Sequence, residues 1–598
     1  MPGRLRTGCG RALPAHTVAD EAGTERRLDR RGLLAGACAL LALVVLAPVL
    51  APGYVLTYDM VFTPRQPLLA ESVGLGSALP RAVPVDAVVA LFTTVVPGDL
   101  LQKALLLLSV WLAAYGAARL VPAQSTAPRL VAATAYAWNA YVTERLFIGH
   151  WVVLLAYGCL PWIVAAGLRV RRGEPGGWPA LILACAPAAL VPTGGVLAAG
   201  AAIAAAGRRR LAGTLGLAVA LNAPWWLPGL LHGLAGNGGS DPAAVDAFAA
   251  RAEGPGGAVV SVLGLGGIWN ADVVPGSRGG ALVPVVALLV LAAGAYGVRR
   301  LAALWGPGPA LALGGLAAAG LVLAVAATVP GLDAALRWTV VHLPGAGLLR
   351  DGQKWAAWWA LLAALGAGLG AEALARVVRA PAAHAVVAGC ALLPLALLPD
   401  LAWGGFGRLQ PVDYPRDWSA VRAALANDEG PGDVLVLPFQ PFRQYGWNDE
   451  RTQLDPAPRF LPRSTIVDDT LVVGDRALRG EDRRAAEVGA ALDEGDPDRL
   501  AALGVGWVLV EHGTPGDVDP AMLARLTTVH DGRWLTLYRV PGPIEDPPTG
   551  ATGTTAARAA VLGTDAAVLI LLLAAAGVLL RRRLLAGTFS SVAERGAN

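Results

Sequence analysis

Long apolar runs separated by short basic segments dominate the first 400 residues. Runs of span length, or nearly so, lie at about 32–51, 100–120, 129–146, 150–168, 211–230, 281–298, 308–329, 353–374, 383–400 and 560–580. A transmembrane helix needs about 20 mostly apolar residues. The pattern therefore predicts an α-helical polytopic membrane protein with about ten spans. The run at 129–146 is the weakest of them, because it contains Asn139, Glu144 and Arg145.

One further apolar run, at 178–206, has basic clusters at both ends. Arg169-Val170-Arg171-Arg172 precedes it and Arg208-Arg209-Arg210 follows it. Two full crossings would need about 40 residues, and a single crossing would leave one arginine cluster on the outer side. We therefore predict a hairpin of two short half-helices that turns at 192–195 and returns to its own side.

Arginine clusters report the orientation of the spans, because cytoplasmic loops carry an excess of basic residues. Ten crossings and one hairpin gather these clusters on one side and predict a multi-pass plasma-membrane protein with both termini cytoplasmic. The predicted organisation is a cytoplasmic tail (1–31), a multi-span domain (32–400), an extracytoplasmic domain (401–555), and a final span with a cytoplasmic tail (556–598).

The stretch 401–555 has the composition of a small soluble α/β domain. Apolar and β-branched runs predict buried strands at 433–437, 506–510 and 534–540. Ala, Leu, Arg and Glu at helical spacing predict helices at 415–427 and 482–503. About 150 residues are enough for one domain with its own core.

Composition agrees with this layout and narrows the classes of function. The chain is 55% hydrophobic and 15% charged, with a mean hydropathy of +0.53, whereas soluble proteins carry about 25% charged residues. The net charge of +4 is dispersed and provides no basic patch for nucleic acid. No cysteine lies in 401–555, which excludes a disulfide framework there.

The first predicted outer loop carries two acidic residues that could do chemistry. Asp59 lies about eight residues beyond the first span, where a lipid-linked substrate would present its headgroup. Asp86 follows in an amphipathic stretch of the same loop. Either carboxylate could act as a general base. The alternative for Asp59 is a solvated loop acid or a partner for Arg65, and Asp86 could simply pair with a cation at the rim.

A second polar segment, Glu144-Arg145 followed by His150-Trp151, lies at the same predicted rim. On a helix, Glu144 and Trp151 would share a face, with His150 nearby. His150 and Glu144 could transfer a proton, or hold a phosphate or a divalent metal cation. The alternative is that these residues only anchor the chain at the membrane interface.

A third candidate is a set of cations. The chain has 48 Lys and Arg residues, of which only Lys103 and Lys354 are lysine, and both begin spans that enter from the outer side. Arg350 precedes Lys354 by four residues. Cations at an outer rim can bind phosphate, and their alternative role is anchoring in the headgroup layer.

The acidic first loop with Asp59, the segment Glu144-Arg145…Gly149-His150-Trp151, the many spans and the C-terminal outer domain together resemble the GT-C class of membrane glycosyltransferases, which use polyprenyl-phosphate-linked sugars. Within that class the chain is most similar to the actinobacterial arabinofuranosyltransferase-like and YfhO-like proteins. Many relatives carry a paired Asp-Asp or Asp-Glu in the first loop, whereas Met60 follows Asp59 here. The resemblance therefore leaves open whether Asp59 or Asp86 is the base.

The resemblance implies an enzyme that moves a sugar from a polyprenyl-phosphate donor to an extracytoplasmic glycan or lipid acceptor in the cell envelope. The implied site residues are the catalytic acids Asp59 or Asp86, the donor-phosphate ligands Arg350, Lys354 and Lys103, and the substrate-binding residues Glu144, Arg145, His150 and Trp151. It assigns no cofactor other than a divalent cation as an option. The donor needs a groove between spans, which the hairpin at 178–206 is expected to line.

Two other functions are compatible with the same layout. Broken helices such as 178–206 are common in transporters, so a transporter or flippase of lipid-linked sugars is one alternative. A non-catalytic assembly protein of the cell envelope is the other, because a fold does not by itself carry an activity.

Overall fold

The computed structural model describes residues 16–77, 79–123, 125–234, 241–474, 476–546, 550 and 552–595; the first 15 residues of the predicted N-terminal tail lie outside this range. Eight helices in the described residues are long and apolar enough to cross a membrane. They are α1 (His16–Leu46), α3 (Gly98–Leu120), α6 (Trp151–Arg171), α9 (Leu211–Leu234), α12 (Val283–Trp305), α13 (Pro307–Val325), α15 (Ala357–Val377) and α23 (Thr555–Arg595). The predicted class, an α-helical polytopic membrane protein, is confirmed.

A ninth crossing is counted if a bent pair of helices forms one span. α16 (Ala380–Leu397) is followed, after a bend of 74°, by a helical segment made of η10 (Pro399–Leu401) and α17 (Ala402–Gly407). Pro399 begins the second part, and a proline cannot continue the hydrogen-bond ladder of the preceding helix. The predicted span at 383–400 therefore ends in a sharp turn toward the sheet domain.

The segment 129–146, predicted as a span, is instead divided into two short helices. α4 (Thr126–Ala137) ends before Asn139, and α5 (Ala140–Phe147) begins after it. Asn139 caps α5, because its side-chain oxygen accepts a hydrogen bond from the Val142 amide at 3.0 Å. Every residue of α5 is buried. The break therefore places Glu144 and Arg145 inside the protein and not in lipid.

The predicted hairpin at 178–206 is present. It consists of α7 (Gly177–Cys185), η3 (Ala188–Leu190) and α8 (Pro192–Ala206). Gly177 lies against the end of α6, Gly194 lies against Ala156 in the first half of α6, and Gly167 near the end of α6 contacts the last turn of α8. α7 and α8 therefore enter and leave on one side of the bundle. The turn lies before Pro192, whereas the predicted turn residues 192–195 form the first turn of α8.

α6 and α15 lie at the centre of the bundle. α6 packs on α3 and α8, and α15 packs on α12 and α4. The crossing of α12 and α15 is close, since a Cβ at Gly366 would lie only 1.8 Å from the carbonyl oxygen of Ala293. Small residues at crossings allow membrane helices to pack without a hydrophobic driving force between them.

Residues 411–546 form the sheet domain. Its five-stranded sheet has the order β10-β11-β9-β3-β6, made of β3 (Asp433–Leu437), β6 (Thr465–Ile466), β9 (Val505–Glu511), β10 (Thr527–Asp531) and β11 (Leu535–Arg539). β3 is parallel to β6 and β9, and β11 is antiparallel to β9 and β10. The helices are α18 (Arg416–Asn427), α20 (Arg483–Glu494), α21 (Pro497–Ala502) and α22 (Pro520–Leu523).

Each face of this sheet has its own apolar core. Val434 and Val436 of β3 pack with α18 on one face, whereas Leu435 and Leu437 pack with α20 and α21 on the other. This alternation follows from the two-residue period of a strand. The three predicted strands correspond to β3, β9 and β11, while the predicted helix at 482–503 is interrupted at Gly495, which has a φ of +62°.

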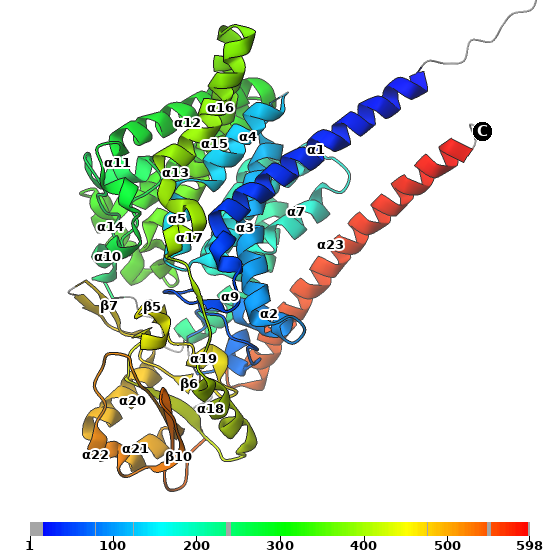
Figure 1. The fold of residues 1–598 in the computed structure, drawn as a ribbon. Helices are drawn as coiled ribbons and strands as arrows, with labels where there is room; N and C mark the ends of the chain where they lie inside the picture. Colours follow the sequence, from blue (N-terminus) through cyan, green and yellow to red (C-terminus); the bar gives the residue numbers. More distant parts are fainter. Residues whose placement is uncertain are drawn as a thin grey trace, which may run out of the picture.

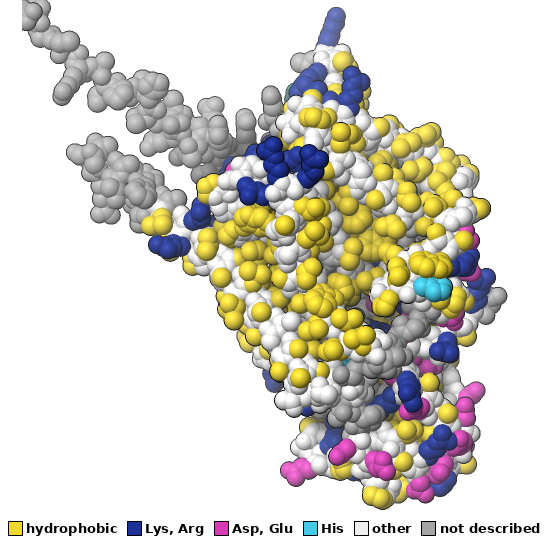
Figure 2. Space-filling view, turned by 180° about the vertical axis from the view of Figure 1, so that it is seen from behind, with side chains coloured by type: hydrophobic (Ala, Val, Ile, Leu, Met, Phe, Trp, Pro, Cys, Tyr) yellow, Lys and Arg dark blue, Asp and Glu magenta, His cyan; other side chains and the backbone are white. Residues whose placement is uncertain are grey.

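The sheet domain and the ends of the two terminal helices lie at opposite ends of the molecule. α1 and α23 extend away from the bundle on the side far from the sheet (Figure 1). On the face that Figure 2 shows, hydrophobic side chains cover the middle of the molecule, basic side chains gather at the end away from the sheet, and acidic and basic side chains mix over the sheet domain. This apolar surface matches the part of the chain that forms the spans.

Candidate active site

The loop that carries Asp59 is held between the helical bundle and the sheet domain. β1 (Tyr54–Val55) pairs antiparallel with β2 (Pro411–Val412). The Tyr58 amide then donates to the Thr452 carbonyl at 2.6 Å, and the Leu454 amide donates to the Tyr58 carbonyl at 2.8 Å. These bonds attach the loop to β5 (Thr452–Leu454), so the sheet domain fixes the backbone next to Asp59.

Asp59 lies in a tight turn that rests on Gly149. The Met60 amide donates to the Thr57 carbonyl at 2.8 Å and closes the turn. Gly149 has a φ of +77°, and a Cβ there would lie 2.4 Å from the Met60 nitrogen and 2.5 Å from the Thr57 oxygen. Because only glycine permits this approach, Gly149 brings the turn over the residue that follows it, His150.

Asp59 begins a chain of hydrogen bonds that runs into the bundle. The Asp59 Oδ2 atom lies 2.8 Å from His150 Nε2, and His150 Nδ1 lies 2.9 Å from an Arg145 terminal nitrogen. Arg145 also donates to both oxygens of Asp351, at 2.9 and 3.1 Å. The chain therefore joins the first loop, α5, the start of α6 and the segment before α15.

The other side chains of this cluster hold Arg145 in place. Gln353 accepts from Arg145 and donates to Glu144 at 3.1 Å. Glu144 is fully buried and also accepts from the Ile268 amide at 3.2 Å. Lys354 Nζ lies 3.2 Å from Asp351 Oδ2. Arg145 and Lys354 thus share one carboxylate close to His150.

The bonding pattern determines the protonation of His150. A guanidinium can only donate, so His150 Nδ1 must accept and the ring proton must lie on Nε2, which donates to Asp59. Burial and the charges of Lys354 and Arg145 keep the pKa of His150 below its ordinary value, although Asp59 opposes this. A neutral imidazole of this tautomer is the form that both contacts require.

Asp59 remains ionised in this environment. Burial alone would raise its pKa, but the hydrogen bond from His150 and the positive charges of Lys354 and Arg459 outweigh burial, so the pKa of Asp59 lies below its ordinary value. Its side chain is 42% exposed. The arrangement therefore presents a reachable, ionised carboxylate that a histidine orients, and the ionised form is the one that a general base requires.

The second acidic candidate, Asp86, is bound elsewhere. It lies in the first turn of α2 (Val85–Thr93) and forms a 3.1 Å ion pair with the Nε atom of Arg459. Arg459 lies in α19 (Ala457–Phe460) of the sheet domain. Asp86 is thus separate from the histidine chain, and the two acids are connected only through the charge of Arg459.

The remaining predicted residues are distributed around the site. Arg350 forms a 3.1 Å ion pair with Glu481 of the sheet domain, and Lys103 forms a 3.1 Å ion pair with Asp99 one turn away on α3. Trp151 packs on Phe62 of the first loop, with ring centroids 4.9 Å apart. Of the three predicted phosphate ligands, only Lys354 lies in the cluster with Asp59 and His150.

Sequence reasoning assigned no role to Asp351, Gln353 and Arg459. Asp351 and Gln353 lie between the predicted cations Arg350 and Lys354. An acid and an amide at the start of a span are costly there, and this could have identified them as site residues. Arg459 lies 373 residues from Asp86. It lies in a stretch with no recognisable motif, and nothing in the sequence pointed to it.

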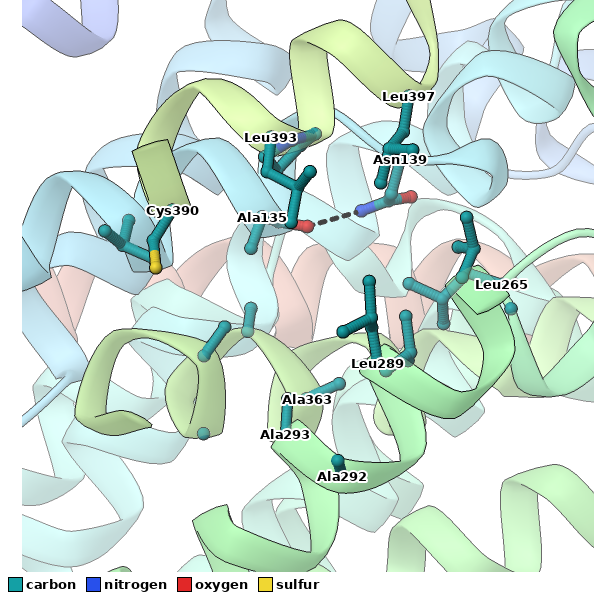
Figure 3. A pocket seen from close by; sticks show the side chains of 18 of the residues that line it. Ala135, Asn139, Leu265, Leu289, Ala292, Ala293, Ala363, Cys390, Leu393 and Leu397 are labelled. Carbon is teal, nitrogen blue, oxygen red and sulfur yellow. Dashed lines mark hydrogen bonds between the residues drawn. The ribbon is translucent and has the colours of Figure 1, made fainter. Parts of the chain in front are cut away.

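A large apolar cavity of about 440 Å³ opens in the membrane-spanning part of the protein, between α4, α12, α15 and α16. Figure 3 shows its wall of aliphatic side chains, among them Leu289, Ala363 and Leu393, with the amide of Asn139 at one end. Ser277 and Arg278 are further polar residues of the lining. The hairpin α7–α8, which was expected to line a groove, does not contribute to this cavity.

A metal site is the other option that the sequence raised. Throughout the described ranges of the chain, no three His, Cys, Asp or Glu side chains lie close enough together to hold an ion. Two acidic side chains of this region are paired with cations: Asp351 with Arg145 and Lys354, and Asp86 with Arg459.

Comparison with known proteins found similar solved structures. No protein-family model and no curated protein sequence matches the chain. Its structure is similar to that of the arabinofuranosyltransferase AftD from Mycobacteria, with a TM-score of 0.53 and 18% identity. The match covers 86% of this chain and 40% of AftD, so the chain spans about two fifths of its length.

Two further structures match at lower scores. ArnT from Cupriavidus metallidurans has a TM-score of 0.39 and 14% identity, over 86% of this chain and 98% of ArnT. The oligosaccharyltransferase of Archaeoglobus fulgidus has a TM-score of 0.39 and 12% identity, over 86% of this chain and 74% of the enzyme. On the strength of the AftD match, the chain shares the fold of the GT-C membrane glycosyltransferases.

Proposed function

We propose that this protein is a membrane glycosyltransferase that moves a sugar from a polyprenyl-phosphate donor to a glycan or lipid acceptor on the extracytoplasmic side. The observation that carries the proposal is the hydrogen-bonded chain from Asp59 through His150 and Arg145 to Asp351. It joins a reachable carboxylate to a set of cations at one end of the spans, within a GT-C fold.

In the proposed reaction Asp59 is the general base. Its carboxylate takes the proton of an acceptor hydroxyl while the hydroxyl oxygen forms a bond to the anomeric carbon of the donor sugar. The bond between that carbon and the phosphate oxygen breaks, and the lipid phosphate leaves with the bonding electrons. His150 orients Asp59 through the Nε2–H donor and keeps it ionised.

Lys354 is the proposed ligand of the donor phosphate. Its ammonium group lies in the cluster, is 21% exposed and shares Asp351 with the fully buried Arg145. A cation at this position would stabilise the negative charge that develops on the leaving phosphate. Arg350 and Lys103 have carboxylate partners outside the cluster, so their role in the proposal is limited to the approach of the lipid headgroup.

The hydrocarbon chain of the donor requires an apolar surface inside the membrane. The cavity between α4, α12, α15 and α16 provides one, because it extends along α12 from Leu282 to Tyr296. At 1.5 Å per residue this is about 20 Å, most of the thickness of the hydrocarbon layer. We assign this cavity to the lipid chain of the donor.

Sugar transfer in reconstituted membranes tests the proposal. Purified protein in liposomes, supplied with a radiolabelled polyprenyl-phosphate sugar and an acceptor, should form labelled product, and the Asp59→Asn variant should form far less. Translocation of the labelled lipid should be assayed in parallel, because the re-entrant hairpin α7–α8 favours a flippase as the second candidate. Translocation that persists in Asp59→Asn, without transfer in either protein, would replace the glycosyltransferase by the flippase.

A further inference from the structure

Arg459 is a cation of the sheet domain whose positive charge acts on Asp59. It lies in α19, its carbonyl accepts a hydrogen bond from the Thr63 hydroxyl at 3.0 Å, and its Nε atom pairs with Asp86 at 3.1 Å. Thr63 follows Phe62, which packs on Trp151, the residue after His150. The backbone of Arg459 is therefore fixed against the loop that carries Asp59.

The guanidinium of Arg459 keeps unused donors. Only its Nε atom bonds to Asp86, and neither terminal amino group donates to a protein acceptor within the described part of the chain. The side chain is 19% exposed. The two terminal groups of a guanidinium form a planar fork that matches two oxygens of a phosphate.

The other cations of the cluster differ from Arg459. Arg145 is fully buried and donates to Asp351, Gln353 and His150. Lys354 has Asp351 as its partner. Lys354 is 21% exposed and keeps free N–H donors of its own. Arg459 is thus a second cation near Asp59 with free donors and access to solvent, and it alone of the two offers a planar fork. Its positive charge also helps to lower the pKa of Asp59.

We propose that Arg459 is a ligand of the donor phosphate, so that the sheet domain contributes directly to the substrate site and completes it. This inference rests on the proposed function, since it names a further residue of the same phosphate site. The bond to Asp86 holds the fork in place through Nε and leaves its two terminal groups for the anion.

The experiment is a binding titration of the purified full-length protein in detergent with farnesyl phosphate, a short prenyl phosphate, and with farnesol as the uncharged control. Arg459→Gln should weaken farnesyl phosphate binding about tenfold or more, the range for a lost hydrogen bond to a charged group. Asp86→Asn should leave binding equal or tighter, because it removes a competing anion and retains the cation.

Arg422→Gln is the matched control. Arg422 is another guanidinium of the sheet domain that bonds to the first loop, but among the described residues it donates only to the Arg65 and Phe460 carbonyls. We expect Arg422→Gln to bind farnesyl phosphate as the wild type does. Thermal unfolding of each variant shows whether it is folded. If Arg459→Gln does not fold, Asp86→Asn becomes the test: equal or tighter binding of farnesyl phosphate agrees with the inference, and weaker binding contradicts it.

Three outcomes would overturn the inference. The first is unchanged binding in a folded Arg459→Gln protein. The second is equal weakening in Arg459→Gln and Asp86→Asn, which is the result for an ion pair that merely ties the loop to the sheet domain. Both leave the proposed function standing. The third, a wild type that binds farnesol as well as farnesyl phosphate, would remove the phosphate site and the proposed function with it.

Discussion

At the scale of single residues, the chemistry of Asp59 depends on its neighbours. His150 can donate to Asp59 only because Arg145 occupies its other nitrogen. Arg145 in turn is held by Asp351. A substitution at any of these positions changes the ionisation or orientation of the Asp59 carboxylate indirectly. Variants of these hydrogen-bonded residues should therefore be compared by their pH profiles as well as by their rates.

Substitution of the two acids of the first loop should give unequal effects. Asp59→Asn is nearly isosteric and should lower sugar transfer by about 10²–10⁴-fold, the usual cost of losing a general base. Asp86→Asn should lower the rate of sugar transfer far less, because Asp86 pairs with Arg459 and lies outside the series of hydrogen bonds through His150. Initial rates in one reconstituted transfer assay provide the comparison. Full activity in Asp59→Asn together with loss in Asp86→Asn would reverse the assignment.

The acid limb of the pH profile should move when His150 is replaced. In the wild type the pKa of Asp59 is lowered, so the carboxylate stays ionised and kcat/KM should fall only below the ordinary aspartate value of about 3.9. His150→Leu removes the hydrogen bond that lowers this pKa and leaves burial to raise it. We expect the acid limb to shift to higher pH. An unshifted limb would show that His150 does not set the ionisation of Asp59.

At the scale of elements, the contact between the first loop and the start of α6 positions the site. Gly149→Ala would add a Cβ 2.4 Å from the Met60 nitrogen at a φ of +77°, which costs about 1–3 kcal/mol of strain or moves the turn. We expect sugar transfer to fall at least tenfold while the protein still folds. Gly389→Ala is the control, since a Cβ there meets nothing within 4 Å. Equal activity of the two variants would contradict this role of Gly149.

In the sheet domain, the buried carboxyl group of Glu511 also has a perturbed pKa. Arg443 lies between Asp455 and Glu511, and all three are buried. Burial, reinforced by the charge of Asp455, raises the pKa of Glu511 to about 8, against the attraction of Arg443. The folded state thus holds a proton that the unfolded chain releases near pH 4.3. The stabilisation from this proton is complete below about pH 4 and is lost as pH rises to 8.

The free energy of unfolding of the sheet domain should therefore fall between about pH 4.3 and 8, because the unfolded state binds fewer protons in this window. Glu511→Gln should flatten the dependence. Hydrogen exchange of the β3 and β9 amides in the full chain, corrected for the intrinsic exchange rate, measures it. The same slope in Glu511→Gln and wild type would assign the pH dependence to another group.

The elements themselves followed closely from sequence where local signals were strong. β3 was predicted at its observed bounds and α18 within one residue, because a two-residue or 3.6-residue period over a buried face is a local property. The prediction of one span at 129–146 was wrong for an equally local reason. Asn139 starts a new helix there, and the length of the apolar run concealed the cap.

At the scale of the whole molecule, the orientation in the membrane is the main prediction. The arginine clusters predict that 171–177 lies inside and the sheet domain outside. In a background without the native cysteines, Asp493→Cys should react with an impermeant thiol reagent in intact cells, and Arg172→Cys only after lysis. Both positions are exposed in the structure. Labelling of Arg172→Cys in intact cells would show that the topology is the reverse of the predicted one. Asp59 would then lie on the side opposite to an outer-leaflet donor.

The sequence by itself determined the class of the protein, the positions of most spans, the hairpin and three of the five strands of the sheet, because each is set by the length, period or flanking charge of one continuous segment. It also singled out Asp59, His150 and Lys354, since polar groups at a membrane rim are costly. It could not determine how they meet. Arg145 and Asp351 are 206 residues apart and Arg459 is 373 from Asp86. Their contacts arise only when the first loop packs on Gly149 and the sheet domain docks on that loop, so the tertiary structure alone decided which acid a histidine orients and which cations lie beside it.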